Sequence, residues 1–394
     1  MPFPLEPELT DSALPLAEQV VRLQALLEAS RAVHSTIDQK DVLLQSARIA
    51  VRELEMDGAL FTEPQVSYGD FPASTDTLPR FELLARDGKP LTEFIVATPG
   101  GRALTLYEND FLEGLALQTA LALENAINHE RHLAYARVAR DLEAARAIQR
   151  SLLPQTMPVV PGYSLAARTQ ACYEVGGDYL DVVTEDDGSL LIVVADVAGK
   201  GLASALMGAT IRSAFRALAR QSLSLDELAT TLSQQHWEEG LEARLRYVTA
   251  IFIRLNAARG ELECVNAGHN PAVLFSGRGS GPTLIAASGT PLGLLPGASY
   301  TVERLRLAPD AALLLYTDGL TEVFRGEEEF GEDRLIDAFL QADQPSRSCD
   351  PARAEAALES LWLTLDEFSS GGQQQDDMSA VALCRHPLTP MEIE

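Results

Sequence analysis

Four short segments that contain aspartate are spread over the C-terminal two-thirds of the 394-residue chain. They are Glu174-Val-Gly-Gly-Asp-Tyr-Leu-Asp181, Ala195-Asp-Val-Ala-Gly-Lys-Gly201, Tyr316-Thr-Asp-Gly-Leu-Thr-Glu322 and Gln375-Asp-Asp-Met378. Asp196, Asp318 and Asp376 each stand beside an apolar run that is typical of a buried strand. A carboxylate at the end of a buried strand is costly unless something pairs with it. Several such carboxylates in one place require cations, so the segments predict a metal centre with oxygen ligands.

Each segment taken alone also has an ordinary structural interpretation. Asp178, Asp318 and Asp376 lie in sequences that are common in turns, and Asp196 could cap a helix or a turn. The Gly-Lys-Gly after Asp196 is not a P-loop, because Gly201 stands where that motif has Ser or Thr. His269, in Asn-Ala-Gly-His-Asn-Pro, favours a structural residue in a hairpin turn over a catalytic one. Only the four acidic segments together favour the metal centre.

Composition excludes some classes of function. The chain carries 31 Lys and Arg against 57 Asp and Glu, a net charge of -26, so phosphate backbones and anionic membrane surfaces repel it. No apolar stretch approaches the roughly 20 residues that span a bilayer, and the N-terminus is acidic where a signal peptide is basic. The four cysteines are scattered, which indicates neither disulfides nor a zinc site. We therefore expect a cytoplasmic protein that binds neither nucleic acid nor membrane.

Hydrophobic periodicity predicts the elements of the N-terminal third. Residues 1–17 are Pro-rich and are predicted to be disordered. Helices are expected over 18–35 and 41–54, the second capped by the Asp of Ser35-Thr-Ile-Asp. Short strands are expected within 58–105, at residues 60–62, 81–85 and 94–97.

A long helix is predicted over 111–153. Its first half is apolar and should pack on the N-terminal domain, whereas the segment 129–153 is charged and reads as a linker. Small and apolar residues recur on that linker at spacings suited to a coiled-coil seam: Ala134, Val138, Leu142, Ala145 and Leu152. A single helix that lies on its own domain is the alternative. Pro154, Pro158 and Pro161 should end the helix and mark a domain boundary.

Beyond the prolines, strands come in runs and helices in blocks, which favours an α+β layered sandwich over a wound parallel sheet. The expected strands are 189–195, 247–255, 261–266, 272–275, 311–316 and 379–383. The expected helices are 203–220, 225–235 and 352–368.

Eight motifs in this order resemble one family, the RsbU/SpoIIE-type branch of the metal-dependent, type 2C-like (PPM) protein serine/threonine phosphatases. The four acidic segments are joined by Ala147-Ile-Gln-Arg-Ser-Leu-Leu-Pro154, Tyr247-Val-Thr249, Asn266-Ala-Gly-His-Asn-Pro271 and Gly289-Thr-Pro-Leu-Gly293. The resemblance covers residues 145–385 and implies an αββα sandwich over residues 160–386, with a tail at 387–394. It also implies two Mn²⁺ or Mg²⁺ ions that activate a water for attack on a phosphoserine or phosphothreonine.

The resemblance assigns residues to this two-metal site. Asp178, Asp196, Asp318 and Asp376 match the acids of the family, with Asp196 bridging the metals and Val197 lending its carbonyl oxygen. Asp377 stands where type 2C enzymes often carry Asn, and we count it among the metal residues. The general-acid His of type 2C enzymes is missing after Asp196, which leaves the proton donor unidentified, with a metal-bound water as the natural substitute.

Residues 18–128 resemble a GAF domain, a sensor fold that can bind a small ligand. The helix pair, the strand-rich middle and Leu115-Ala-Leu-Gln-Thr-Ala-Leu-Ala-Leu-Glu-Asn-Ala-Ile127 carry this resemblance. In the phosphatase family, substrates are often small phosphorylated anti-anti-sigma (STAS) proteins, so the resemblance implies a STAS-like regulatory partner and a homodimer through the linker helix. The alternative is a non-catalytic dimeric signalling module that binds a partner through a phosphatase fold.

Overall fold

The computed structural model describes residues 16–277, 281–342 and 352–387. The chain divides into two compact units, Met1–Ala139 and Arg140–Glu394. Residues 1–17 were predicted to be disordered. Of these, residues 1–15 lie outside the described residues, whereas residues 16 and 17 belong to a helix. The predicted tail at 387–394 lies outside the described residues except for residue 387.

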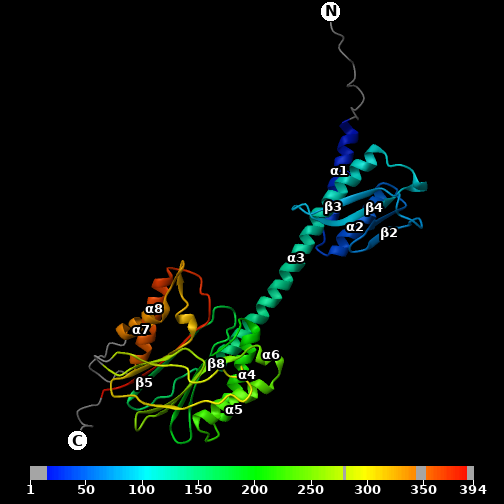
Figure 1. The fold of residues 1–394 in the computed structure, drawn as a ribbon. Helices are drawn as coiled ribbons and strands as arrows, with labels where there is room; N and C mark the ends of the chain where they lie inside the picture. The colour runs from blue at the N-terminus through cyan, green and yellow to red at the C-terminus, as the bar shows by residue number, and fades with distance from the viewer. Residues whose placement is uncertain (1–15, 278–280, 343–351, 388–394) are drawn as a thin grey trace, which may run out of the picture. The chain divides into compact units, whose positions relative to one another are not determined.

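An antiparallel four-stranded sheet forms the centre of the first unit, in the order β2-β1-β4-β3. Its strands are β1 Gly58–Phe61, β2 Val66–Gly69, β3 Arg80–Leu84 and β4 Pro90–Ala97. The helices are α1 Leu16–Val33, α2 Gln39–Glu53 and the first part of α3 Leu106–Leu152, with the 3-10 turn η1 Pro99–Gly101 before α3 (Figure 1). One hydrophobic core joins the sheet to these helices, and Phe61 stacks on Phe94 within it, with ring centroids 4.6 Å apart.

The predicted helices and strands of this unit are confirmed to within a few residues, except that the strand β2 was not expected. β2 has only four residues, none of them fully buried, so its sequence carries little hydrophobic pattern. The predicted cap of the second helix is confirmed, since the Asp38 carboxylate accepts a hydrogen bond from the Asp41 backbone N–H at 3.0 Å.

Helix α3 has 47 residues and begins at Leu106, five residues before the predicted start at Phe111. An ion pair explains the earlier start. The Arg102 guanidinium binds both carboxylate oxygens of Glu108, at 2.6 and 2.8 Å, and Glu108 also accepts the Thr105 backbone N–H at 2.8 Å. The helix ends before Pro154, as predicted. Val138, on the predicted seam, is 56% exposed, and pairing of this helix with a second copy stays a prediction.

Two antiparallel five-stranded sheets form the core of the second unit. The first has the order β11-β10-β13-β16-β5, with β5 Tyr163–Gln170, β10 Ala272–Phe275, β11 Thr283–Ile285, β13 Ala312–Tyr316 and β16 Met378–Arg385. The second has the order β12-β9-β8-β7-β6, with β6 Tyr179–Thr184, β7 Leu190–Val197, β8 Val248–Asn256, β9 Glu261–Ala267 and β12 Glu303–Arg306.

Helices cover the outer face of each sheet (Figure 1). Helices α7 Gly331–Ala342 and α8 Arg353–Ser369 pack on the first sheet, and α4 Leu202–Leu218 and α5 Leu225–Glu238 pack on the second. The short elements are α6 Leu241–Arg244, η2 Asp318–Leu320, β14 Phe324–Arg325 and β15 Glu328–Glu329. These four layers are the predicted αββα sandwich.

Alternation along the strands explains the layers, because successive side chains of a strand point to opposite faces. In β7, Ile192 and Val194 pack between the sheets, whereas Val193 packs under α4 and α5. In β13, Leu313 packs between the sheets and Leu314 packs under α7 and α8. Strands buried on both faces read as continuous apolar runs, which is why these two were predicted.

Several elements of the second unit were missed. They are β5, β6, β11, β12, β14, β15, α6 and α7. Most lie at sheet edges or are very short: β5, β6, β11 and β12 each end a sheet, and β12 has no fully buried residue. The exposed residues of β5, β11 and β12 leave no long apolar run on which prediction depends, and the buried Asp181 interrupts the apolar run of β6.

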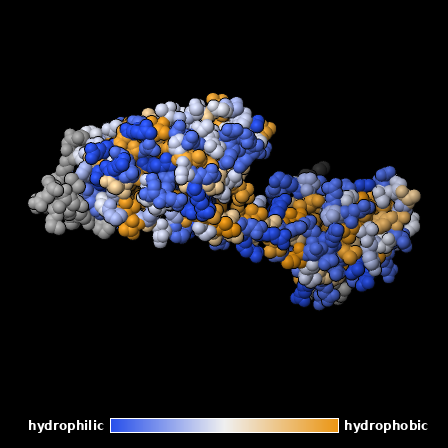
Figure 2. All heavy atoms as spheres, turned by 90° about the horizontal axis from the view of Figure 1, so that it is seen from below, coloured by the Kyte–Doolittle hydropathy of each residue, from blue (hydrophilic) through white to orange (hydrophobic). Residues whose placement is uncertain are grey.

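Hydrophilic side chains cover most of the face seen in Figure 2, with apolar residues in scattered groups. Within the described ranges, every helix is too short or too polar to cross a lipid bilayer.

Candidate metal centre

The second sheet places two of the predicted acids side by side. Strands β6 and β7 are antiparallel with Tyr179 opposite Ala195, so Asp178 just before β6 lies next to Asp196 near the end of β7. Asp196 follows Val194 by two residues, and Val194 packs between the sheets, so the Asp196 side chain leaves the same face. This end of the second sheet therefore directs two carboxylates toward the first sheet.

The first sheet supplies the other two acids in the same way. Strands β13 and β16 are antiparallel with Tyr316 opposite Ala380, so the chain leaves β13 beside the point where it enters β16. Asp318 opens the turn η2 after β13, and Asp376 lies two residues before β16. The predicted residues Asp178, Asp196, Asp318 and Asp376 thus meet at one end of the sandwich, between its two sheets.

A threonine that was not predicted as a site residue links the two sheets at this end. The Thr317 hydroxyl donates to a carboxylate oxygen of Asp178 at 2.8 Å and accepts the Ser379 backbone N–H at 2.9 Å. Thr317 is fully buried. It therefore orients Asp178 from the opposite sheet, and only the three-dimensional pairing of the sheets reveals this role.

The electrostatics of the acids show an excess of negative charge. Burial and the neighbouring charge of Asp196 hold the pKa of Asp178 well above its usual range. Burial, followed by the charges of Asp318 and Asp376, raises the pKa of Asp196 to about 7. Burial and the charge of Asp376 also raise the pKa of Asp318. Partly buried carboxylates that repel one another are stabilised by a cation, which returns their pKa values toward the ionised range.

One cation near the acids belongs to the chain itself. The Lys200 ammonium lies 2.6 Å from a carboxylate oxygen of Asp376 and donates to the Gln375 carbonyl oxygen at 2.7 Å. Its charge also lowers the pKa values of Asp196 and Asp318 against the larger effect of burial. Lys200 therefore offsets part of the negative charge, and a metal that binds Asp376 would compete with this ion pair.

Asp377 has a distinct environment. It is 8% exposed, and its two carboxylate oxygens accept the backbone N–H groups of Cys172 at 2.8 Å and Gly177 at 2.6 Å. A side chain at Gly176 would meet this carboxylate at 2.5 Å, so glycine is required there. Asp377 thus holds the loop that carries Asp178, and its ligation of a metal stays a prediction.

The end of α3 holds the same loop from its other side. The Gln149 side-chain amide donates to the Gly176 carbonyl oxygen at 2.7 Å and accepts the Gly176 N–H at 3.1 Å. These two bonds join the helix to the loop two residues before Asp178. The sequence motif that contains Gln149 was recognised, but its contact with the glycine loop was not.

His269 is structural, as its sequence context favours. It is 4% exposed, its Nδ1 lies 2.9 Å from the Thr249 hydroxyl, and its backbone N–H donates to the Asn266 side chain at 2.8 Å. Burial lowers the pKa of His269 to about 4, so the ring is neutral at pH 7. A neutral imidazole favours the structural role over that of the missing general acid, and Thr249, which contacts it, lies opposite Asp196 in the sheet.

The donor set fits hard divalent cations. The four aspartates offer carboxylate oxygens, and the Val197 carbonyl oxygen lies close by, 3.0 Å from where a side chain at Gly177 would begin. Mn²⁺ and Mg²⁺ both accept such oxygen sites. Across the described ranges, however, no three His, Cys, Asp or Glu side chains are close enough to hold an ion as they stand. The acids would have to draw together around a cation, and their assignment as ligands stays a prediction.

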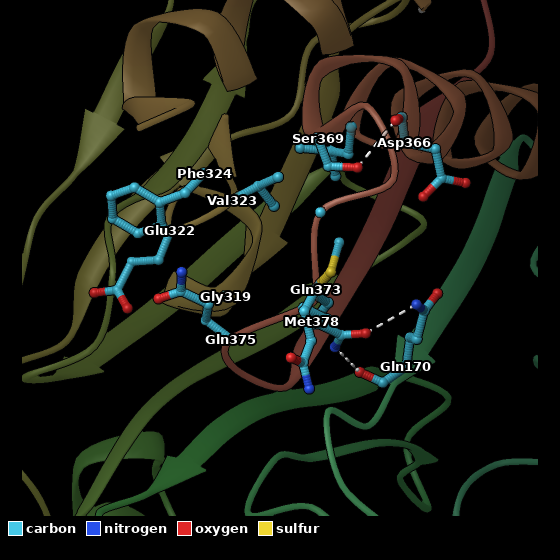
Figure 3. A pocket seen from close by; sticks show the side chains of 13 residues that line it. Gln170, Gly319, Glu322, Val323, Phe324, Asp366, Ser369, Gln373, Gln375 and Met378 are labelled. Atoms are coloured by element: carbon cyan, nitrogen blue, oxygen red, sulfur yellow. Dashed lines mark hydrogen bonds between the residues drawn. The ribbon is translucent and has the colours of Figure 1, made fainter. Parts of the chain in front are cut away.

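A small polar pocket of about 90 Å³ borders the acids on the side of α8 (Figure 3). The Gln170 and Gln374 side chains close part of it, since the Gln170 amide donates to the Gln374 side-chain oxygen at 2.9 Å. Gly319 and Gln375 also line it, directly beside Asp318 and Asp376 in the chain. The pocket is lined by amide groups, by the carboxylates of Glu322 and Asp366 and by apolar side chains, and no Lys or Arg is among the described residues that line it.

With this geometry in place, comparison with known proteins identifies the family. The family model described as Stage II sporulation protein E (SpoIIE) matches residues 186–386, which is half of the chain. The chain belongs to the SpoIIE family. The match includes Asp196, Asp318 and Asp376 but begins after Asp178, so only the fold and the neighbouring contacts link Asp178 to the site.

Two relatives and one solved structure show how far the likeness to known proteins extends. Protein IcfG of Synechocystis sp. is 24% identical over 62% of this chain and 42% of its own length. Phosphoserine phosphatase RsbP of Bacillus subtilis is 32% identical over 46% of this chain and 45% of its own length. The SiaA-PP2C domain of Pseudomonas aeruginosa has a TM-score of 0.54 at 24% identity, covering 64% of this chain and 98% of that one. The PP2C-like fold of the C-terminal part is thereby confirmed, and the chain spans less than half of the length of IcfG and RsbP.

Proposed function

We propose that the chain is a metal-dependent protein phosphatase that hydrolyses phosphoserine or phosphothreonine on a regulatory protein. The observation that carries the proposal is the meeting of four carboxylates from two sheets at one end of the sandwich, with the pKa of Asp196 raised to about 7. Such a centre favours cations, and the names of RsbP and RsbU as phosphoserine phosphatases support the reaction class.

In this proposal each residue of the candidate centre has a defined role. Asp178, Asp196, Asp318 and Asp376, with the Val197 carbonyl, would hold two Mn²⁺ or Mg²⁺ ions. Bound divalent ions supply an activated water and neutralise phosphoryl oxygens. Thr317 orients Asp178 from the opposite sheet, and the buried Asp377 fixes the preceding glycines. A side-chain nucleophile is not required for this reaction class.

The test is phosphate release from a phosphoserine peptide by the full chain with and without Mn²⁺. We expect Mn²⁺-dependent release that the substitution Asp196→Asn abolishes. Asp186→Asn is the matched control, because Asp186 is an exposed acid at the turn between β6 and β7, away from the acidic centre. Equal activity of wild type and Asp196→Asn would refute the proposal.

We further propose that the substrate is a phosphorylated STAS-like protein and that the N-terminal unit is a GAF-like sensor able to hold a small ligand. The support is the resemblance of both regions and the sheet of the first unit, which three helices cover. A phosphorylated STAS protein should be dephosphorylated faster than an unrelated phosphoprotein, at equal concentration. Equal rates would remove the STAS assignment and leave the phosphatase itself standing.

The homodimer through the linker helix is also proposed, because apolar Val138 and Ile148 are exposed on that helix, at 56% and 63%. Sedimentation of the full chain and of Val138→Glu tests it, and a monomeric wild type would refute it. The alternative of a non-catalytic signalling module predicts a chain that binds a partner but neither Mn²⁺ nor phosphoserine.

A further inference from the structure

We propose that Arg146, Arg150 and Arg168 form an anion-binding subsite that holds an oxyanion of the phosphoprotein substrate beside the acidic centre. The inference rests on the proposed phosphatase function and deepens it. All three arginines line one pocket of about 440 Å³ whose wall also contains Asp178 and Asp377. Pockets of this size bind small ligands or side chains. The pocket therefore lies where a phosphorylated side chain would enter.

The two elements that carry the arginines direct them to one place. Arg146 and Arg150 are four residues apart in the last turns of α3, which puts them on the same face of the helix. Arg168 comes from the edge strand β5, and its guanidinium lies over the Trp362 ring, 4.9 Å from the centroid. Stacking on a buried ring restricts the guanidinium, so less conformational freedom is lost when it binds an oxyanion.

The three arginines lack a carboxylate partner within the described structure. None of the ion pairs found among described residues includes any of them. The Arg146 Nε atom is buried without a hydrogen-bond partner. A buried donor without a partner is unusual and costly, and a ligand oxygen would satisfy it. In a chain with 57 acidic residues against 31 basic ones, three arginines that share a pocket and form no ion pair with any described residue indicate an external anion.

The geometry and the chemistry together define the ligand class. A guanidinium presents a planar pair of donors that matches two oxygens of a phosphate or a carboxylate. The phosphoprotein offers two sources of such oxygens: the phosphoryl group itself and an acidic side chain next to the phosphoserine. Both would be held beside Asp178, so the shared chemistry is an oxyanion of the substrate.

Steady-state kinetics of Arg146→Gln, Arg150→Gln and the double variant test the subsite. Three substrates distinguish the sources: p-nitrophenyl phosphate, a phosphoserine peptide flanked by neutral residues, and the same peptide flanked by Glu. Loss of one charge-assisted hydrogen bond should raise KM about tenfold with little change in kcat. A higher KM for all three substrates assigns the subsite to the phosphoryl group. A higher KM for the Glu-flanked peptide alone assigns it to the acidic side chain.

Two controls separate recognition from folding. Arg259→Gln removes a charge from an exposed arginine between β8 and β9 and should leave KM unchanged. Arg150→Lys keeps the charge but loses the planar fork, so its KM should lie between those of wild type and Arg150→Gln. KM values for the double variant within about twofold of wild type on every substrate would overturn the subsite.

Binding measured without turnover separates this inference from the proposed function. Calorimetry in EDTA with the Glu-flanked phosphopeptide should give weaker binding to the double arginine variant than to wild type. If wild type binds the peptide in this way but hydrolyses none of the substrates, the phosphatase proposal fails and the subsite stands. If wild type and the double variant bind equally, the subsite fails whatever the activity.

Discussion

A single added methyl group at Gly176 should disturb the loop that carries Asp178. The first carbon of an alanine side chain there would lie 2.5 Å from one carboxylate oxygen of Asp377 and 2.8 Å from the other. The Gly176 backbone itself has no left-handed φ that excludes alanine. The clash with Asp377 is therefore the whole cause of the expected effect.

The size of the expected effect follows from the hydrogen bonds that hold the Asp377 carboxylate in place. Its carboxylate is 8% exposed and accepts backbone N–H groups from Cys172 and Gly177, at 2.8 and 2.6 Å. It cannot retreat without losing these bonds, and a hydrogen bond to a charged group contributes about 1.5–3 kcal/mol. Loss of both predicts that Gly176→Ala lowers the free energy of unfolding by about 3–6 kcal/mol. Because Asp178 follows the same loop, the Mn²⁺ concentration for half-maximal activity should also rise.

Urea denaturation and Mn²⁺ titration of activity measure the two effects. Gly208→Ala is the matched control, since Gly208 lies in α4 with its nearest neighbour at an ordinary 3.4 Å, and alanine there should be neutral or stabilising by up to about 1 kcal/mol. A double-mutant cycle with Asp377→Ala adds a sharper criterion. Removal of the carboxylate makes room for the methyl group, so Gly176→Ala should cost much less in that background. If Gly176→Ala lowered the free energy of unfolding equally in wild type and in the Asp377→Ala variant, the reasoning would be refuted.

Four further predictions concern other groups around the site. Arg216→Met should destabilise the fold by about 3–5 kcal/mol in urea denaturation, because it leaves the fully buried Asp181 carboxylate without the guanidinium that binds it at 2.6 and 2.7 Å. Gln149→Met should raise the Mn²⁺ concentration for half-maximal activity, while loss of two neutral hydrogen bonds lowers stability by only about 2 kcal/mol. Burial lowers the pKa of His269 to about 4, so between pH 6.5 and pH 4 the folded state binds fewer protons than the unfolded state. The free energy of unfolding should therefore fall by about 3 kcal/mol as the pH is lowered from 6.5 to 4. The substitution His269→Asn should remove this pH dependence. Burial and neighbouring acids raise the pKa of Asp196 to about 7, so its charge opposes folding most strongly above pH 7; without metal, Asp196→Asn should raise the thermal midpoint at pH 8 and change it little at pH 4.

The sequence could predict where Asp196 and Asp318 lie because each stands at the end of a strand buried on both faces. An apolar run such as β7 or β13 fixes where the strand ends, and the residue after it must lie at the rim of the sheet. The grouping of the four acids in one centre rested on the resemblance to the phosphatase family, because β6 and the antiparallel pairing of the strands were not predicted. The helices after Asp196 and the long α3 were predicted on the same ground, namely an apolar stripe at helical spacing.

What the sequence could not predict depends on contacts between segments far apart in the chain. The bond from Thr317 to Asp178 joins residues 139 positions apart and exists only because the two sheets are packed face to face. The pairing of Lys200 with Asp376 has the same origin. The adjacent acids Asp376 and Asp377 look equivalent in sequence, yet one meets an ammonium group and the other two backbone N–H groups. Local patterns carry no information on such differences.

The acids lie between the two sheets, a position that favours cation binding but lowers the stability of the metal-free fold. Each sheet contributes two acids, so neither sheet alone can form the centre, and packing of the hydrophobic layer between them forces like charges together. The hydroxyl of Thr317 and the ammonium of Lys200 offset part of that repulsion. Burial first, and then the remaining repulsion, still raise the pKa of Asp196 to about 7. A cation that binds there would relieve the remainder and tie the sheets to each other. In the proposed metal centre, affinity for a cation would therefore derive from burial and repulsion that folding has already produced.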